Sequence, residues 1–288
     1  MKLIFITVFT ISFTISGIQA ESIAPLTLYV VTDAHVGRCD KGDDMMKFAE
    51  MCNANKPDIV LDLGDTIEGS STEFYDYVTD RQAALAQQLD WLNAWNSINI
   101  EHKEVAFGNR DVREDYPLGD DDWIGVLGYE DRPKIGGTSL QNSFTVENDD
   151  VKAMVIVTSQ YSETFDLDKT LEWVEEEVLG FDGDFIVFAA HNAGLYPHFR
   201  DMLIKNDVET SVLYLHGHNH GPDTLVRDAW GYEQMKLDFP SFLVTDLMCS
   251  GKGAKFRLYP GGHYEKFRLD VRNREISEPE MHYQTRVE

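Results

Sequence analysis

Cysteine, proline and basic residues are all scarce in this sequence. Its 288 residues include 3 cysteines, 9 prolines and 25 lysines and arginines. An odd number of cysteines excludes complete disulfide pairing within one chain, and the spacing of Cys39, Cys52 and Cys249 assigns no pair. Internal repeats and Pro- or Ser-rich linkers are also missing. We therefore expect residues 21–288 to form a single domain.

Charge is strongly unbalanced toward acid. The 50 aspartates and glutamates give a formal net charge of -25 and an isoelectric point near 4.6. Such a surface repels phosphate backbones and anionic lipids, so nucleic acid is an unlikely backbone-bound partner and an anionic membrane is disfavoured too. The 43% of hydrophobic residues is ample for one large globular core.

The sequence has one markedly apolar run, at its N-terminus. Lys2 precedes an apolar segment at 3–15, and small residues at 16–20 lead to Glu21. This pattern is typical of a secretory signal peptide over residues 1–20, cleaved after Ala20. A membrane anchor is the alternative, but the run is short for a spanning helix and no second one follows. We expect an exported protein, secreted or periplasmic, with no transmembrane anchor after cleavage.

Apolar runs and turn residues alternate along the rest of the chain. Runs at 26–32, 58–63, 104–107, 184–190 and 211–215 predict buried strands, and 142–147 with 151–158 predicts an antiparallel hairpin. Further strands are expected at 241–247, 255–259 and 264–269, followed by a peripheral tail from 272. Helical spacing predicts helices at 43–55, 73–95, 167–179 and 195–204, with Met46, Leu85, Leu89, Leu92 and Trp95 among their core positions. Residues 116–137 show no period, which indicates a long loop facing the substrate.

Polar residues follow five of the predicted strands. Aspartate, asparagine or histidine stands at each of these strand ends: Asp33 and His35, Asp65, Asn109, His191, and His218 with His220. Ligands of α/β sheets bind at the carboxyl ends of strands. Carboxylate, carboxamide and imidazole together suit Zn, Mn or Fe better than calcium.

Several polar residues of the sequence also have a simpler explanation. Asp33 could cap a helix, and the loop that carries His218 could be a polar turn. The acidic run at 120–122 could bind a cation but is more often a solvated face. His216, at the end of its strand, is interpreted as a packed histidine. Five strand ends in succession are nevertheless hard to explain as caps or turns.

The series resembles the calcineurin-like metallophosphoesterase family. That family shows Asp-x-His, Gly-Asp, Gly-Asn-His-(Asp/Glu), a lone His and Gly-His-x-His in this order. The matching segments here are Asp33-Ala34-His35, Gly64-Asp65, Gly108-Asn109-Arg110-Asp111, His191 and Gly217-His218-Asn219-His220. The resemblance covers roughly residues 26–221. It implies an α/β fold, a four-layer αββα sandwich in which helices flank two β-sheets, and a site for two divalent metal ions.

The resemblance also implies a role for each matching residue. Asp33, His35 and His220 would hold the first metal, Asn109, His191 and His218 the second, and Asp65 both. A hydroxide between the metals would attack the phosphorus of a small phosphorylated substrate. The residues expected to take part in catalysis are Asp65, Asn109, Arg110 and Asp111.

Arg110 departs from the family pattern. The family usually has histidine there, as general acid for the leaving oxygen, whereas arginine is a poor proton donor and a good phosphate ligand. The form Gly-Asn-Arg-Asp is similar to that of the family's lipid-linked nucleotide pyrophosphohydrolases. Those enzymes act on the cytoplasmic side, which conflicts with a signal peptide.

Three functions remain open from the sequence. The leading one is an exported phosphoesterase that acts on monoesters or diesters. The second is a nucleotide or sugar-nucleotide pyrophosphatase, suggested by Arg110. The third is a metal-stabilised binding protein whose catalysis has lapsed with the missing histidine.

Overall fold

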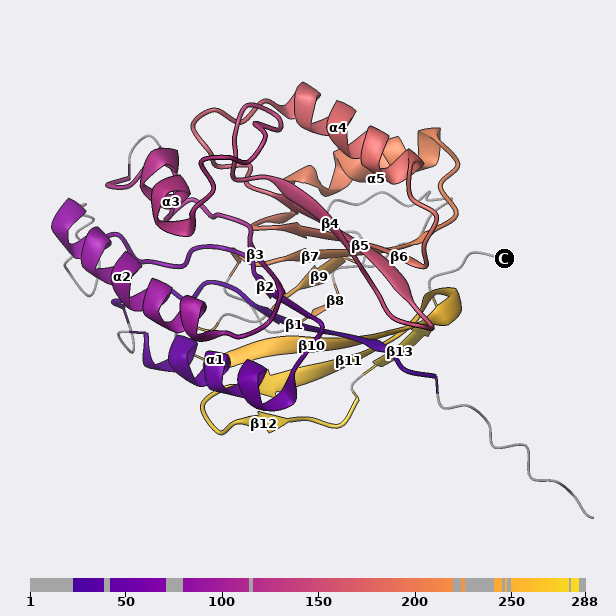
Figure 1. Cartoon of the computed structure of the whole chain (residues 1–288), viewed down its shortest axis with the longest axis horizontal. Coiled ribbons are helices and arrows are strands. Elements are labelled where there is room, and N and C mark those ends of the chain that lie inside the picture. Colours follow the sequence, from indigo (N-terminus) through magenta and orange to yellow (C-terminus); the bar gives the residue numbers. More distant parts are fainter. Residues whose placement is uncertain are drawn as a thin grey trace, which may run out of the picture.

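Two β-sheets stack face to face, with helices on their outer faces (Figure 1). This computed structural model describes residues 23–38, 42–70, 80–113, 116–219, 224–225, 241–244, 247, 250–279 and 281–284. The arrangement confirms the expected four-layer αββα sandwich. The expected signal peptide, His220, Cys39 and Cys249 lie outside the described residues.

The first sheet is mixed. Its strand order is β12-β11-β10-β1-β2-β3, and β13 also pairs with β11. Strands β1, β2 and β3 are parallel, whereas β10 is antiparallel to β1. The bounds are β1 Leu26–Val31, β2 Ile59–Asp62, β3 His102–Val105, β10 Lys252–Tyr259, β11 His263–Asp270, β12 Glu275–Ile276 and β13 Met281–Gln284.

The second sheet has the order β4-β5-β6-β7-β9-β8. Strands β5, β6, β7 and β9 are parallel, and the predicted hairpin is present as the antiparallel pair β4 and β5. The bounds are β4 Asn142–Glu147, β5 Lys152–Thr158, β6 Phe185–Ala190, β7 Ser211–His216, β8 Thr224–Leu225 and β9 Ser241–Leu243. Parallel strands bring their carboxyl ends to one edge of the sheet, and the polar residues that follow these strands therefore lie at that edge.

Alternation of side chains along the strands divides the core into layers. In β1, Leu28 and Val30 face the second sheet and pack with residues of that sheet such as Val155. Tyr29 and Val31, on the opposite face, pack under the helices. Strands β1, β2, β5, β6 and β7 are therefore buried on both faces along almost their whole length, which explains the continuous hydrophobic runs in the sequence.

Helices α1 and α2 cover the first sheet, and α4 and α5 cover the second (Figure 1). The helices and short 3-10 turns are α1 Asp43–Asn55, α2 Arg81–Ser97, α3 Asp120–Leu127, α4 Leu167–Leu179, η1 Ala193–Leu195, α5 Tyr196–Lys205 and η2 Pro260–Gly262. Helix α2 begins at Arg81, where the Asp80 side chain accepts hydrogen bonds from the backbone N–H groups of Gln82 and Ala83, and residues 73–79 of the expected helix lie outside the described residues.

Three predicted core positions are wrong. Leu85 and Leu89 of α2 are 41% and 59% exposed, and Met46 of α1 is 39% exposed. The buried stripe of α2 instead passes through Trp91 and Trp95, which stack with ring centroids 5.2 Å apart. These large rings set the rotation of the helix, because they bury more apolar area than leucine.

The segment 116–137 is not simply a loop, since it contains α3. Three aspartates in its first turn favour a helix start, because carboxylates stabilise the positive end of the helix dipole. Trp123 is buried, and its indole N–H donates to the Asp111 carbonyl at 2.9 Å. Asp122 forms a salt bridge with Arg81, so the acidic run has structural contacts.

The C-terminal segment is joined to the first sheet and to α1. Strands β12 and β13 pair with β11, Arg272 forms a 2.6 Å salt bridge with Asp44, and Arg274 pairs with Glu50. Cys52 of α1 is a buried free thiol. Over the described part of the chain, no helix combines the length and apolar character needed to cross a membrane.

Candidate metal centre

The loops that follow the parallel strands meet at one end of the two sheets. The Asp33 N–H donates to the Gly64 carbonyl at 2.8 Å, and the His35 N–H donates to the Asp65 carbonyl at 2.9 Å. The His218 N–H donates to the Asp33 carboxylate at 2.8 Å, which ties β7 of the second sheet to β1 of the first. Residues more than 180 positions apart are thereby fixed in one cluster.

A first group of donor atoms belongs to Asp33, His35 and Asp65, all buried. The His35 Nε2 lies 3.7 Å from Asp33 Oδ1 and 3.6 Å from Asp65 Oδ2. One ligand atom from each residue lies within 4.8 Å of the others. Two carboxylates and an imidazole at such separations form a donor set suited to a divalent metal.

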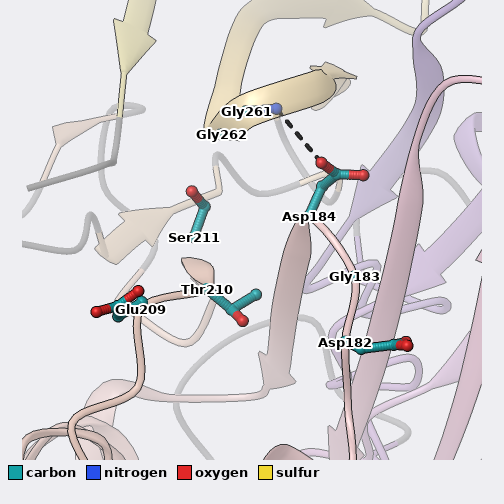
Figure 2. Close-up of a pocket in the computed structure, with 8 residues that line it drawn as sticks. All are labelled: Asp182, Gly183, Asp184, Glu209, Thr210, Ser211, Gly261 and Gly262. Carbon is teal, nitrogen blue, oxygen red and sulfur yellow. Dashed lines mark hydrogen bonds between the residues drawn. The ribbon is translucent and has the colours of Figure 1, made fainter.

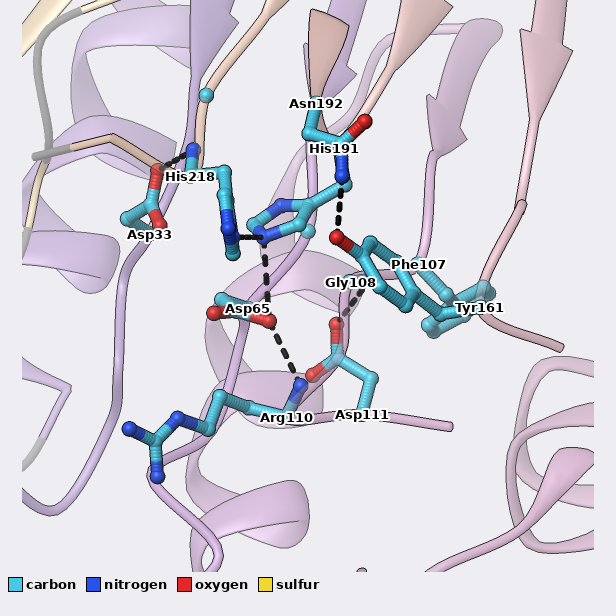
Figure 3. Close-up of polar contacts among 12 residues, drawn as sticks. Asp33, Asp65, Phe107, Gly108, Arg110, Asp111, Tyr161, His191, Asn192 and His218 are labelled. Atoms are coloured by element: carbon cyan, nitrogen blue, oxygen red, sulfur yellow. Dashed lines mark hydrogen bonds and ion pairs between the residues drawn. The ribbon is translucent and has the colours of Figure 1, made fainter. Parts of the chain in front are cut away.

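A second group shares Asp65 with the first. The His191 Nε2 lies 3.4 Å from Asp65 Oδ1 and 3.1 Å from His218 Nδ1 (Figure 3). The other oxygen of Asp65 faces His35, so this single carboxylate stands between both groups. The Asn109 Oδ1 is buried and has no hydrogen-bond partner among the described residues, as expected of a donor reserved for a cation.

Hydrogen bonds orient two of the imidazoles. The His191 Nδ1 lies 2.8 Å from the Leu63 carbonyl, which can only accept, so this nitrogen carries the proton. The His35 Nδ1 lies 2.9 Å from the Glu68 carboxylate. In both rings Nε2 is therefore the atom left facing Asp65. Metal-binding histidines usually have this arrangement, in which the other ring nitrogen contacts a carboxylate or a carbonyl.

Buried acids dominate the electrostatics of the centre. Burial opposes a charge on His35, but the Asp33 and Glu68 carboxylates outweigh it and raise the pKa of His35 to about 10. Burial likewise opposes a charge on His191, yet Asp65 raises its pKa to about 9. The pKa of Asp65 is lowered by His191 and His35 despite its own burial. A cation in this cluster would take over the role of these protons.

Backbone strain gathers at the same residues. Seven non-glycine residues of the described chain have positive φ, and four of them belong to the centre: Asp33 at 51°, His35 at 40°, Asp65 at 51° and His218 at 74°. A left-handed conformation is unfavourable for such side chains and is retained where the surrounding structure enforces it, often at functional sites. The strain supports a functional cluster.

Two glycines allow the loops to approach this closely. A Cβ on Gly108 would lie 2.3 Å from Asp65 Oδ1 and 2.8 Å from His191 Nδ1. A Cβ on Gly217 would lie 1.8 Å from the Thr32 hydroxyl and 2.5 Å from Asp33 Oδ2. Any side chain at either position would push the ligand residues apart.

Asp111 and Arg110 differ in their surroundings. Asp111 is buried, and its carboxylate accepts from the Gly108 N–H at 2.9 Å and the Thr66 N–H at 2.9 Å. These contacts favour a positioning role, because they join the loops after β2 and β3. The Arg110 N–H donates to Asp65 Oδ1 at 2.7 Å, while its guanidinium extends away from Asp111 (Figure 3).

The sequence interpretation missed Glu68. This largely buried carboxylate lies beside the His35 ring, and it is 3.6 Å from both Arg38 Nη1 and Arg110 Nη1. Glu68 therefore connects a candidate metal ligand to Arg110. Its position three residues after Asp65, in the same loop, is the signal that could have indicated it.

Tyr161 and Asn192 were also missed. Tyr161 follows β5 and packs against His191, and Asn192 is the next residue after His191. A polar or aromatic residue at the end of the neighbouring parallel strand could have indicated Tyr161. His216 behaves as expected for a packed histidine: burial lowers its pKa to about 4, and its Nε2 has no hydrogen-bond partner among the described residues.

A separate pocket of about 280 Å³ lies at the opposite ends of β6 and β7 (Figure 2). Asp182, Gly183 and Asp184 line it just before β6, and Glu209 and Thr210 line it just before β7. Because His191 and His218 follow these strands, the pocket is not part of the centre.

Comparisons with known proteins agree with this geometry. The sequence pattern of the calcineurin-like phosphoesterases matches residues 26–222, a span that runs from β1 past the His218 loop. The chain belongs to this family. The family is named for the hydrolysis of phosphoric esters. The resemblance inferred from the motifs is confirmed.

Solved structures share the fold of this chain at low identity. A purple acid phosphatase from yellow lupin (Lupinus luteus) seeds is 11% identical, with a TM-score of 0.51 over 89% of this chain and 53% of the lupin chain. This chain thus spans about half the length of the lupin enzyme. GAP50, described as the anchor in the inner membrane complex of Plasmodium, is 12% identical, with a TM-score of 0.53 over 92% of this chain and 90% of its own. No curated protein matches the sequence.

Proposed function

We propose that this protein is an exported phosphoesterase that uses two divalent metal ions to hydrolyse phosphomonoesters or phosphodiesters. One observation carries the proposal. The two oxygens of Asp65 face two different groups of donor atoms, one with His35 and one with His191. A carboxylate shared in this way is suited to two neighbouring cations.

The donor atoms fit such ions. Asp33, His35 and Asp65 would hold one metal, and Asp65, Asn109, His191 and His218 the other; His220 is proposed for the first metal from its sequence position alone. Imidazole and carboxylate ligands suit Zn, Mn or Fe. Metals at a site of this kind make water nucleophilic at neutral pH and offset charge on phosphoryl oxygens.

Arg110 is proposed to bind a phosphate oxygen of the substrate. Its backbone is fixed by Asp65, and its side chain is 12% exposed beside Glu68, with the Tyr116 ring centroid 5.5 Å away. The guanidinium is therefore held near the centre while part of it faces solvent. A planar fork of N–H donors matches two phosphate oxygens.

The second candidate function, a nucleotide or sugar-nucleotide pyrophosphatase, is favoured by a second arginine. Arg38 and Arg110 both lie 3.6 Å from Glu68, so two guanidinium groups stand together at the edge of the centre. In a chain of net charge -25, two adjacent arginines suit a substrate that carries a second phosphate group.

A substrate panel separates these functions. Monoesters, diesters and pyrophosphates would be tested with added Mn, Zn and Mg, with metal content measured by elemental analysis. We expect turnover that depends on metal, and loss of both metal and turnover in Asp65→Asn. Asp149→Asn, on the exposed turn between β4 and β5, is the matched control. A protein that holds its metals and hydrolyses none of the panel would instead be a binding protein whose catalysis has lapsed.

Export is proposed from the N-terminal sequence alone. It requires a mature chain that begins at Glu21. The intact mass of the protein recovered outside the cytoplasm tests this, and a chain that retains Met1 in a membrane fraction would contradict it.

A further inference from the structure

Tyr161 lies against both imidazoles of the second group. It follows β5, and its ring centroid is 5.7 Å from that of His191 and 6.2 Å from that of His218. The ring is partly buried and partly open to solvent, on the side of the centre opposite the Arg110 guanidinium (Figure 3). The tyrosine thus borders the space in front of the candidate ligands.

The hydroxyl group of Tyr161 acts as an acceptor toward the protein. The Asn192 side-chain oxygen accepts the Gly194 N–H at 2.7 Å, and a backbone N–H can only donate. The amide nitrogen of Asn192 must therefore be the group that faces Tyr161, and it donates to the phenolic oxygen. Among the described residues nothing accepts the phenolic proton of Tyr161, which is left to be donated elsewhere.

We propose that Tyr161 donates a hydrogen bond to the leaving-group oxygen of the substrate. The inference rests on the proposed phosphoesterase function. A water-derived hydroxide forms a bond to phosphorus while the bond between phosphorus and the leaving oxygen breaks, and the electron pair of the broken bond stays on that oxygen. The phenolic O–H stabilises the developing negative charge, and the departing oxygen then takes a proton from water. Position 110 carries an arginine, which is charged and a poor proton donor. Tyr161 offers a neutral O–H donor on the other side of the centre.

The test compares two leaving groups. The full chain, loaded with Mn, would be assayed with p-nitrophenyl and phenyl esters, as monoesters and as methyl diesters. Tyr161→Phe removes only the hydroxyl. We expect kcat/KM for the phenyl esters to fall by about tenfold or more, and for the p-nitrophenyl esters by less than about threefold, because p-nitrophenolate leaves without such help. Tyr259→Phe, whose hydroxyl contacts Glu265 on β11, is the matched control.

A second variant keeps the proposal testable if Tyr161→Phe loses its fold or its metal. In Asn192→Asp the carboxylate still accepts the Gly194 N–H, but it has no N–H to donate. It would instead accept a hydrogen bond from the Tyr161 O–H, which would then no longer reach the leaving oxygen. The ring stays in place, so the phenyl esters should again lose more activity than the p-nitrophenyl esters. Metal content would be measured in each variant.

The outcomes separate the two proposals. If the unmodified protein hydrolyses no ester with metal, the phosphoesterase function fails, and the role of Tyr161 fails with it. If the unmodified protein is active but both variants keep its ratio of phenyl to p-nitrophenyl activity, the phosphoesterase function stands and the role of Tyr161 is overturned. A selective loss in the variants, with Tyr259→Phe unchanged, supports it.

Discussion

At the scale of single residues, the centre depends on buried charges that are satisfied by one another. The side chains of Asp33, His35, Asp65 and His191 are at most 3% exposed, and each faces a group of opposite charge. An unpaired charge in such a place costs several kcal/mol, on the order of 3–5 when a partner is removed. Single substitutions here should therefore have large effects.

Arg110 gives the first prediction. Arg110→Ala removes a charged hydrogen bond of about 1.5–3 kcal/mol to the substrate, so kcat/KM should fall by roughly ten- to a hundredfold. Steady-state kinetics across several leaving groups measures this. Arg274→Ala, which breaks an exposed pair with Glu50 of α1, should leave kcat/KM unchanged. Equal activity in Arg110→Ala would mean that Arg110 only pairs with Glu68.

Glu68 gives the second prediction. Glu68→Gln weakens the hold on the His35 Nδ1 and on Arg110 together, so we expect metal affinity to fall by about 10- to 100-fold, the usual cost of losing a second-sphere carboxylate. Titration with Mn, followed by activity at saturating metal, separates the two effects. The exposed Glu147→Gln in β4 serves as control. Unchanged metal affinity would show that Glu68 does not orient His35.

At the scale of elements, the centre is made by loops that could not meet without glycine. The loop after β7 lies against the end of β1, and Gly217 is the contact point. Strands β1, β2, β6 and β7 are buried on both faces, so they hold the loop ends at fixed positions. The strained φ angles of the ligand residues follow from these fixed ends.

Gly217 gives the third prediction. Gly217→Ala places a methyl group 1.8 Å from the Thr32 hydroxyl, so the loops must separate. We expect about 1–3 kcal/mol of lost stability, typical of overpacking, together with reduced metal binding. Chemical denaturation and elemental analysis measure both. Gly125→Ala in α3 meets nothing within 4 Å and should gain up to about 1 kcal/mol, because alanine favours helix. Wild-type metal content in Gly217→Ala would contradict the close packing.

At the scale of the whole molecule, charge and fold act together. The net charge of -25 would repel an anionic substrate, so metal ions and arginines at the centre must reverse the local potential. The same acids that would hold the metals raise the pKa values of the imidazoles. Metal binding and proton binding therefore compete for one cluster.

This competition gives the fourth prediction. In the chain without metal, His35 and His191 have pKa values of about 10 and 9, above their ordinary value of 6.5. Their protonation stabilises that form fully below pH 6.5, and this contribution is lost as pH rises through 9 to 10. Metal ligation needs neutral imidazole, so metal uptake at neutral pH should release protons and metal affinity should rise with pH.

Calorimetry in two buffers of different ionisation enthalpy measures the released protons. Thermal unfolding without metal should show falling stability between neutral and alkaline pH, and a metal-loaded sample should resist this fall. His102→Asn, in β3 away from the centre, is the matched control. Metal uptake at neutral pH with no proton release would contradict the assignment of His35 and His191.

The sequence by itself determined where most strands lie along the chain, and the resemblance of its motifs to a family implied the class of fold. Continuous apolar runs identify strands buried on both faces, and helical spacing placed α1 and α4 at the observed bounds. Polar residues directly after these runs indicated the candidate ligands, because parallel strands present their carboxyl ends at one edge. The strand positions depend on local periodicity and the candidate ligands on short motifs, and a single chain records both.

Only the tertiary structure decided which side chains face one another. The rotation of α2 depends on the packing of Trp91, so the exposure of Leu85 and Leu89 could not be read from spacing. Glu68 reaches His35 and Arg110 from a different loop, and Tyr161 reaches His191 from a neighbouring strand. Such contacts join residues far apart in the chain, and their geometry is set by sheet stacking and loop approach, which the local periodicity of the sequence does not record.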